Sequence, residues 1–292
     1  MATKLPIVVG YNDKKHSRAA LVWAVQEARR RQAPLRVLFA ANYPGMTYGA
    51  TGDAVEPDPG ALEAAEAVTA TGVAIARGTA PELDIIGSTD VLSPSKALIE
   101  ASSSAQLVVI GTRGRSSLLA AFLGSVAFTI AGRAACPVIV VKGDPTKPPA
   151  HDVVAVGTDG SPEADNAVRH AAEFAKGWKV PLEVICCTGI DRMPAELDRA
   201  HHGAEEIISR TLAALPAYYS DLELSGRIAD AAPEQVLVEA STKVRLVVVG
   251  SRGRGAFDGL LLGSVSHAVI HGAQCPVAVI GSKAGLRLTP PM

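Results

Sequence analysis

The chain of 292 residues lacks the features that mark several large classes of protein. Charge of one sign is not in excess, because 28 basic and 29 acidic residues leave a net charge of −1, so bulk binding to nucleic acid or to an anionic membrane is not indicated. No apolar run approaches the roughly 20 residues of a membrane span, and the opening MATKLPIVVG shows no secretory signal pattern. We therefore expect a soluble, cytoplasmic protein with no nucleic-acid or membrane partner.

Cysteine is scarce, and its four residues follow no metal-binding or redox spacing. Cys136 and Cys275 each precede a proline and a strand-like run, while Cys186 and Cys187 are adjacent inside another such run. Because no C-x-x-C pair occurs, zinc and thioredoxin chemistry are disfavoured, and we expect small buried apolar side chains at these positions.

Histidine offers no clear metal site either. His267 and His271 lie four residues apart on a predicted helix, which is the spacing of two ligands on one face. However, no glutamate follows His267 and no third ligand is evident, so the zincin pattern is absent. The identity of any protein-bound metal is left open.

Small and aliphatic residues are what the chain has in plenty. It is 48% hydrophobic and 20% charged, with only 4% aromatic residues. This balance is globular and suits the close packing of α/β layers. The length gives room for about two domains of ordinary size.

The sequence contains two copies of one unit. The segment GTRGRSSLLAAFLGSV (111–126) is repeated as GSRGRGAFDGLLLGSV (250–265), which aligns Gly111 with Gly250. Earlier landmarks, such as Gly10 and Gly157, lie farther apart in the sequence than Gly111 and Gly250 do. The first copy therefore carries an insertion, which we place in the Gly/Pro-rich segment 43–60 and predict to be a long surface loop.

The repeated unit spans nearly half of the chain, so it is far longer than the roughly 20–50 residues of a solenoid repeat and indicates a duplicated domain. We place the first domain at residues 1–142 and the second at residues 152–283. The polar, proline-rich segment 143–151 between them is typical of a linker. Residues 284–292 form a C-terminal tail.

Strand and helix patterns alternate along each copy, which predicts an α/β fold. Near-continuous Val/Ile runs such as RLVVVG (245–250) indicate strands that are covered on both faces, as in a parallel sheet. The segment GAEEIISRTLAALPAYY (203–219) is predicted to be one of the helices. Alternating units of this kind form a doubly wound sheet, whose ligands bind beyond the carboxyl ends of the strands.

Both copies carry the same glycine-rich loop, in which two residues separate the first two glycines and nine residues precede a Gly-Ser-Val turn. Glycines let the backbone approach a ligand closely, and the free N–H groups at the helix start suit an anion such as phosphate. A purely structural role in turns and caps is the alternative. The loop is neither a Walker A loop nor a dinucleotide fingerprint, because Asp258 stands where the latter needs glycine.

The two copies differ directly after their first strand. The second copy has GTDGS, with Asp159, where the first copy has GYNDK, with Asn12. An asparagine donates and accepts hydrogen bonds but cannot neutralise a metal that bridges phosphates. Asp13 follows one residue later, and we expect its side chain to point elsewhere.

Together these motifs resemble the universal stress protein family in its tandem form, over about residues 5–142 and 152–282. The resemblance rests on the glycine spacing, the strand and turn LVV(I/V)G(T/S)RGR, the CPV strand and VGTDGS. It implies that each domain is a five-stranded, parallel, Rossmann-like sheet of order 3-2-1-4-5, as in adenine nucleotide alpha hydrolases. It also implies ATP as the cofactor, with Mg²⁺.

The resemblance further implies which residues meet ATP. In the family, the β- and γ-phosphates lie at the Gly-Ser-Val turn, the acidic residue after the first strand lies near the ribose and phosphates, and a main-chain group after the second strand meets the adenine. In the second copy the corresponding residues are Asp159, Cys187 (main chain), Gly250, Gly253, Gly263, Ser264 and Val265. In the first copy they are Asn12, Ala40 (main chain), Gly111, Gly114, Gly124, Ser125 and Val126.

Basic residues flank both loops, and two interpretations of them stay open. Arg113 and Arg252 are candidates for phosphate contacts, as are their neighbours Arg115 and Arg254, because a guanidinium matches phosphate geometry. A solvated loop rim is the alternative. Lys14 and Lys15 in the first copy carry the same two interpretations.

The function we expect is that of an ATP-binding regulator in the stress response, read by an unknown protein partner, with at most weak ATP hydrolysis. One alternative is a nucleotide-free scaffold or chaperone-like interaction module. Another is a slow ATPase or an enzyme acting on an adenylated substrate, although no acid–base pattern supports it. The resemblance implies that the final strands of the two domains pair within the chain, and a homodimer is left open, as is nucleotide binding by the first domain.

Overall fold

A computed structural model describes residues 4–43, 59–112, 125–144, 146–189, 194–215, 217–255 and 261–285. Most of the predicted surface loop at 43–60 lies outside these residues. The described part of the chain divides into two compact units, one with the residues up to Val141 and the other with the residues from Lys142 to Gly285.

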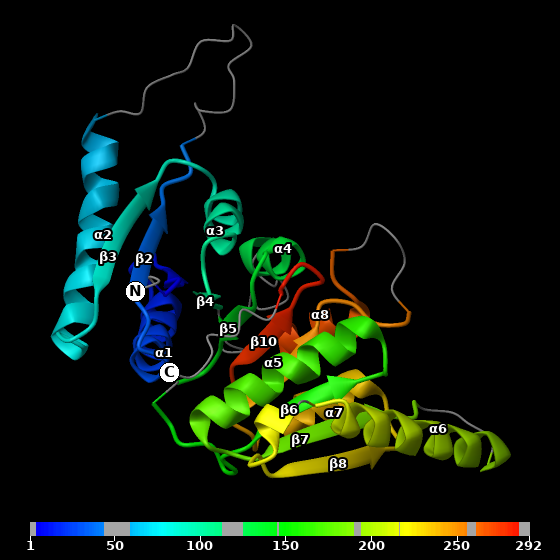
Figure 1. The fold of residues 1–292 in the computed structure, drawn as a ribbon. Helices are drawn as coiled ribbons and strands as arrows, with labels where there is room; N and C mark the ends of the chain where they lie inside the picture. Colours follow the sequence, from blue (N-terminus) through cyan, green and yellow to red (C-terminus); the bar gives the residue numbers. More distant parts are fainter. Residues whose placement is uncertain are drawn as a thin grey trace, which may run out of the picture. The chain divides into compact units, whose positions relative to one another are not determined.

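The described part of the first unit alternates strands and helices (Figure 1). Its strands pair in parallel in the order β3-β2-β1-β4-β5. The elements are β1 (Ile7–Gly10), α1 (Lys15–Arg31), β2 (Leu35–Ala40), α2 (Pro59–Thr79), β3 (Ile85–Asp90), α3 (Pro94–Ser102), β4 (Leu107–Gly111), α4 (Ser125–Arg133) and β5 (Val138–Val141).

The second unit repeats this topology, with the parallel order β8-β7-β6-β9-β10. Its elements are β6 (Val154–Thr158), α5 (Pro162–Trp178), β7 (Leu182–Cys187), α6 (Pro194–Ala213), a 3₁₀ turn (Ala217–Tyr219), β8 (Leu224–Ala229), α7 (Pro233–Ala240), β9 (Leu246–Gly250), α8 (Ser264–Gly272) and β10 (Val277–Ile280). The predicted order 3-2-1-4-5 is therefore confirmed in each half of the chain.

The central strands form the core of each unit. Val8, Val108, Val156 and Val248 have no exposed surface, because helices cover both faces of each sheet. In the first unit α1 packs against α2 and α3 packs against α4, and in the second unit α7 packs against α8. Within the described ranges, no helix is both long enough and apolar enough to cross a membrane.

The helix predicted at residues 203–219 was placed wrongly at both ends. Helix α6 begins at Pro194 and ends at Ala213. Proline is well suited to a first helical position, because its missing N–H would have no helical partner there. The helix ends before Pro216 because a proline disfavours the helical conformation of the residue that precedes it.

Strand β4 ends directly against the start of α1. A Cβ atom at Gly111 would collide with the carbonyl oxygen and carbon of His16. Because both of these are backbone atoms, they cannot move aside without displacing the first turn of α1. The glycine is therefore required by the packing of this helix on the strand end.

We predict that Gly111→Ala lowers the free energy of unfolding by about 1–3 kcal/mol, the usual cost of overpacking. Urea denaturation followed by circular dichroism measures this change. Gly78→Ala in α2 is the matched control, because a Cβ at Gly78 meets no atom within 4 Å. The control is expected to gain about 0.4–1 kcal/mol, and equal stability of the two variants would contradict the packing argument.

Candidate functional site

The turn from β6 into α5 fixes Asp159 through both of its carboxylate oxygens. Oδ1 accepts a hydrogen bond from the Ser161 N–H at 2.9 Å, and Oδ2 accepts one from the Arg254 N–H at 2.8 Å. Gly160, which lies between Asp159 and Ser161 in the chain, has a left-handed backbone with a φ of 72°. Ser161 is the N-cap of α5, and its Oγ accepts from the Ala164 N–H at 3.2 Å. The carboxylate is thus held between a helix start and the glycine-rich loop.

These contacts favour the ionised form of Asp159. Burial of the carboxyl group works against ionisation, but the hydrogen bonds from Ser161 and from the Arg254 N–H outweigh it and hold the pKa of Asp159 below its ordinary value. The carboxylate is therefore a fixed negative charge at neutral pH.

The glycine-rich loop of the second unit folds back onto the end of β9. The Ser251 N–H donates to the Ile280 carbonyl at 2.8 Å, and the Ser251 carbonyl accepts from the Gly263 N–H at 2.8 Å and from Ser266 Oγ at 3.0 Å. A Cβ at Gly253 would lie 2.5 Å from Asp159 Oδ2. The structure thus brings together Gly250, Gly253, Gly263 and Asp159.

Helix α8 begins at this loop with Ser264 and Val265. Its N-cap, Gly263, has a φ of −73°, which any residue can adopt. A Cβ at Gly263 would find its nearest neighbour, Arg252 Cα, at 3.6 Å, an ordinary van der Waals distance. The fold therefore does not require glycine at this position, unlike Gly111. The first N–H groups of a helix have no partner within the helix, so this end can bind an anion.

Cys187 ends strand β7 at the same edge of the sheet. Burial raises the pKa of its thiol to about 11, which is consistent with the apolar role expected for the cysteines. Cys136, Cys186 and Cys275 are buried as expected, whereas Cys187 is only partly buried. Burial and the charge of Asp159 both raise the pKa of Cys186, so the end of β7 lies within the field of that carboxylate.

A polar cluster that sequence reasoning missed follows β7 and β8. Asp230 Oδ1 accepts from Thr188 Oγ1 at 2.8 Å and lies 2.7 Å from His201 Nε2 of α6. Hydrogen bonds from His201 and Thr188 hold the pKa of Asp230 below its ordinary value. No local sequence pattern signals this cluster, because its three residues meet only when α6 packs over the strand ends.

The arginines of the second unit take different positions. Arg252 Nη2 donates to Ser282 Oγ at 3.4 Å. A Cβ at Gly160 would lie 3.0 Å from Arg254 Nη2 and 2.8 Å from Nη2 of Arg210, which also donates to the Gly160 carbonyl at 3.2 Å. Arg210 comes from α6 and was not among the predicted site residues.

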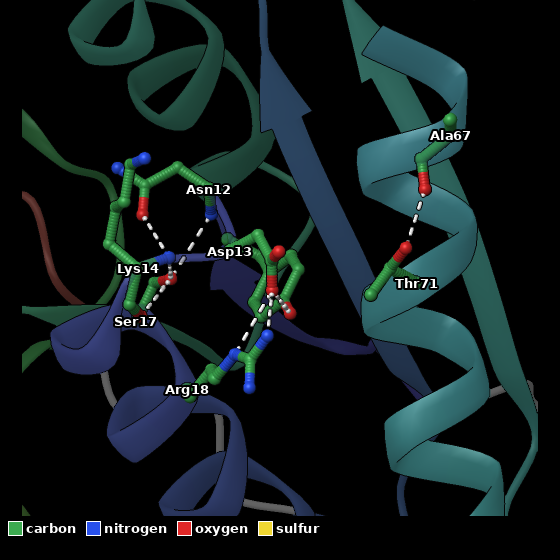
Figure 2. A network of polar contacts seen from close by, with 8 residues as sticks. Asn12, Asp13, Lys14, Ser17, Arg18, Ala67 and Thr71 are labelled. Atoms are coloured by element: carbon green, nitrogen blue, oxygen red, sulfur yellow. Dashed lines mark hydrogen bonds and ion pairs between the residues drawn. The ribbon is translucent and has the colours of Figure 1, made fainter. Parts of the chain in front are cut away.

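In the first unit, Asn12 occupies the position equivalent to Asp159 and makes a similar turn with a longer hydrogen bond. Its Oδ1 accepts from the Lys14 N–H at 3.3 Å, and its own N–H donates to Ser17 Oγ at 3.2 Å (Figure 2). Ser17 Oγ also accepts from the Lys14 N–H at 3.2 Å, so α1 is capped by a serine in its first turn. Lys14 is the N-cap and Lys15 the first residue of α1.

Asp13 stands where the second unit has Gly160, and it too is left-handed, with a φ of 57°. Its Oδ1 accepts from Tyr11 Oη at 2.6 Å and from Arg18 Nη2 at 2.8 Å (Figure 2). Hydrogen bonds from Tyr11 and Arg18 hold the pKa of Asp13 low, while burial and Asp13 raise the pKa of Tyr11 to about 12. The carboxylate of Asp13 is therefore already paired with side chains of its own unit.

The other predicted residues of the first unit are only partly described. Ala40 ends β2, and Gly111 ends β4 against α1. Ser125 and Val126 open α4. Gly114, Gly124, Arg113 and Arg115 lie outside the described residues.

The described residues offer no cluster of three or more His, Cys, Asp or Glu side chains that could hold a metal ion. Asp159 supplies one carboxylate beside the loop, and its two oxygens already accept hydrogen bonds. Mg²⁺ is commonly bound through one or two carboxylates together with substrate phosphates. The described residues are therefore compatible with a cation whose other ligands come from a bound phosphate, and Asp159 is the residue that would contact it.

Comparison with known proteins gives one consistent family. A model of the universal stress protein family matches residues 5–142 and 151–281. A universal stress protein of Mycobacterium tuberculosis is 34% identical over 289 residues, which cover 94% of this chain and 96% of that protein. A crystal structure of a universal stress protein from Archaeoglobus fulgidus DSM 4304 matches with a TM-score of 0.66 at 22% identity, covering 96% of this chain and 97% of its own.

A further solved structure carries a nucleotide. It is the universal stress protein from Archaeoglobus fulgidus in complex with dAMP, which covers 45% of this chain and 98% of its own at 20% identity, with a TM-score of 0.35.

We predict that Asp159→Asn destabilises the second unit at neutral pH and that this difference shrinks in acid. The folded pKa of Asp159 lies below the unfolded value, which is about 3.9. The stabilisation is therefore complete above that value and is lost as the pH falls through the folded pKa. Urea denaturation of both proteins between pH 7 and pH 3 measures the difference.

Asp198→Asn, at an exposed position of α6, controls for the loss of one negative charge. A stability difference between wild type and Asp159→Asn that grows toward pH 3 would contradict the role assigned to the ionised carboxylate.

Proposed function

Because the chain belongs to the universal stress protein family, we propose that it is a nucleotide-dependent regulator in the stress response whose second unit binds ATP. A protein partner then distinguishes the nucleotide-bound form from the free form. Residues 1–142 and 152–283 are proposed as the two domains, and the second is proposed as the one that carries the site.

The observation that carries this proposal is the junction of Asp159 with the glycine-rich loop. Asp159 Oδ2 accepts from the Arg254 N–H, and Gly253 leaves room for that carboxylate. An ionised carboxylate, a loop of small residues and the start of α8 therefore share one edge of the sheet. The carboxyl edge of a doubly wound sheet is where such folds bind their ligands.

The parts of ATP are assigned by chemistry. The N–H groups of Ser264 and Val265 suit the β- and γ-phosphates, because a helix start attracts anions. The carboxylate of Asp159 suits a ribose hydroxyl or Mg²⁺ on the phosphates. The main chain at Cys187, beyond the end of β7, suits the adenine edge. Gly263 supports the phosphate assignment, because the fold itself has room for a side chain there.

The low pKa of Asp159 favours a regulatory role over rapid hydrolysis of ATP. A general base must accept a proton from water, and it works best with a pKa near the working pH. Asp159 accepts hydrogen bonds at both oxygens, and those contacts hold its pKa low. It is therefore a weak base, suited to positioning rather than to proton transfer.

The first unit is proposed to bind nucleotide weakly or not at all. Asn12 has no charge to offer a metal, and its neighbour Asp13 is engaged with Tyr11 and Arg18. The two intact glycine patterns in the sequence therefore do not imply two equal sites.

We predict one ATP site per chain in calorimetric titration with ATP and Mg²⁺, and its loss in Asp159→Ala. Gly263→Ala is expected to keep the melting temperature of the free protein, because its Cβ has room. It should weaken ATP binding by about tenfold or more, because the added methyl group lies where the phosphates approach the start of α8 and would lengthen their hydrogen bonds to the N–H groups there.

Gly177→Ala in α5 is the matched control, because a Cβ there meets no atom within 4 Å. It should bind ATP as the wild type does. Two ATP sites per chain would show that Asn12 can take the place of Asp159 and that the proposed difference between the two units is wrong. No binding by a nucleotide-free preparation, with no thermal stabilisation by ATP and Mg²⁺, would replace the proposal with the scaffold alternative.

A further inference from the structure

Two guanidinium groups from different elements converge on the turn after β6. Arg210 Nη2, from α6, and Arg254 Nη2, from the glycine-rich loop, would lie 2.8 Å and 3.0 Å from a Cβ at Gly160. The separation of the two nitrogen atoms is therefore at most the sum of these distances. Both arginines are exposed, so a ligand from solution can reach them.

Positive charge exceeds negative charge around Gly160. Asp159 is the carboxylate beside it, and it attracts Arg254 while its Oδ2 accepts from the Arg254 N–H. Arg210 donates to a neutral acceptor, the Gly160 carbonyl, and has no carboxylate partner within the described residues. Two positive charges thus face one negative charge, and like charges this close repel each other unless an anion lies between them.

In the first unit, a carboxylate occupies the position equivalent to Gly160. When Gly10 is aligned with Gly157, the counterpart of Gly160 is Asp13, which places a carboxylate there and binds it to Tyr11 and Arg18. When Gly111 is aligned with Gly250, the counterpart of Arg210 is Thr71. The hydroxyl of Thr71 donates to the Ala67 carbonyl of its own helix (Figure 2).

The alignment that pairs Arg210 with Thr71 is supported by packing. A Cβ at Gly87 would meet Thr69, and a Cβ at Gly226 would meet Ile208. The same alignment pairs Gly87 with Gly226 and Thr69 with Ile208, so the two helices pack on equivalent strand positions. The first unit therefore places a carboxylate at the position of Gly160, while the second unit has a glycine there and two guanidinium groups beside the single carboxylate of Asp159.

We propose that Arg210 and Arg254 form an anion site at Gly160 that binds a phosphate group. A guanidinium offers paired N–H donors that match the oxygens of phosphate. Gly160 keeps the space between the two side chains open, because it has no Cβ. The site is distinct from the helix start at Ser264. Arg254 was already a candidate from the glycine-rich loop, and the structure adds Arg210 of α6 at the same turn.

The phosphate has two sources, a phosphate group of a bound nucleotide or free inorganic phosphate. The first case rests on the proposed function and would make Arg210 a residue that selects nucleotides over nucleosides. The second case is independent of ATP binding. Both share the same contacts with Arg210 and Arg254, so the experiment separates them by the probe.

The first test compares the full-length wild type with Arg210→Ala by calorimetry and thermal denaturation. The probes are ATP, adenosine and inorganic phosphate, each added separately. For the nucleotide source, Arg210→Ala weakens ATP about tenfold or more and leaves adenosine unchanged. For the free anion, it removes the stabilisation that inorganic phosphate gives the wild type. Arg199→Ala, at an exposed position of the same helix, is the control for charge.

The second test places an internal anion at the site. Gly160→Asp copies the residue of the first unit, and aspartate tolerates the left-handed conformation there, as Asp13 shows. Its carboxylate is expected to pair with Arg210 and Arg254 and to abolish the phosphate-dependent binding. Gly160→Asn is the matched control, because it has the same shape and conformational preference but no charge.

The outcomes distinguish this proposal from the proposed function. If no nucleotide binds, the ATP proposal fails, and phosphate stabilisation that depends on Arg210 still supports the anion site. If Arg210→Ala matches Arg199→Ala with all three probes, the anion site is overturned. Equal phosphate and ATP binding by Gly160→Asp and Gly160→Asn also overturns it, whatever the affinity for ATP.

Discussion

The turn from the first strand into the first helix is the constraint on which each unit depends. Asp13 and Gly160 both have positive φ values there, and the residues that follow them, Lys14 and Ser161, are extended N-caps. Glycine reaches this conformation without steric cost, whereas another residue loses about 1–2 kcal/mol. In the first unit, the contacts of Asp13 with Tyr11 and Arg18 offset that cost. The same backbone path is thus compatible with two different side-chain arrangements.

These two arrangements differ chiefly in which groups pair with the charged side chains. In the first unit the carboxylate of Asp13 is bound by a neighbouring hydroxyl and guanidinium, so its polar groups are paired internally. In the second unit Asp159 is bound by backbone N–H groups, which leaves the guanidinium groups of Arg210 and Arg254 facing solvent. Charges that are fixed before a ligand arrives need little reorganisation when it binds. The second unit is therefore the one whose electrostatics are prepared for an anion.

The sequence predicts the sheet well and the site in part. Val/Ile runs reveal buried parallel strands because a strand covered on both faces has no polar side to display, and the family resemblance supplies their order. Helix α6 was harder to place, since few apolar residues mark its first half, and its start depends on Pro194. The contacts of His201 with Asp230 and of Arg210 with Gly160 could not be predicted, because α6 brings together residues that are distant in the chain.

The glycines show why identical spacing in the two copies does not establish identical use. Gly111 is fixed by the backbone of His16, whereas at its counterpart Gly250 the nearest atoms to a Cβ are Arg252 O at 3.0 Å and Glu163 O at 3.4 Å. His16 and Glu163 are themselves counterparts, so the first helix approaches the strand end more closely in the first unit. Room at that edge is what a ligand needs, and the second unit has more of it. A glycine retained for helix packing and a glycine retained for ligand access therefore look the same in sequence, and only the distance to the neighbouring helix separates them.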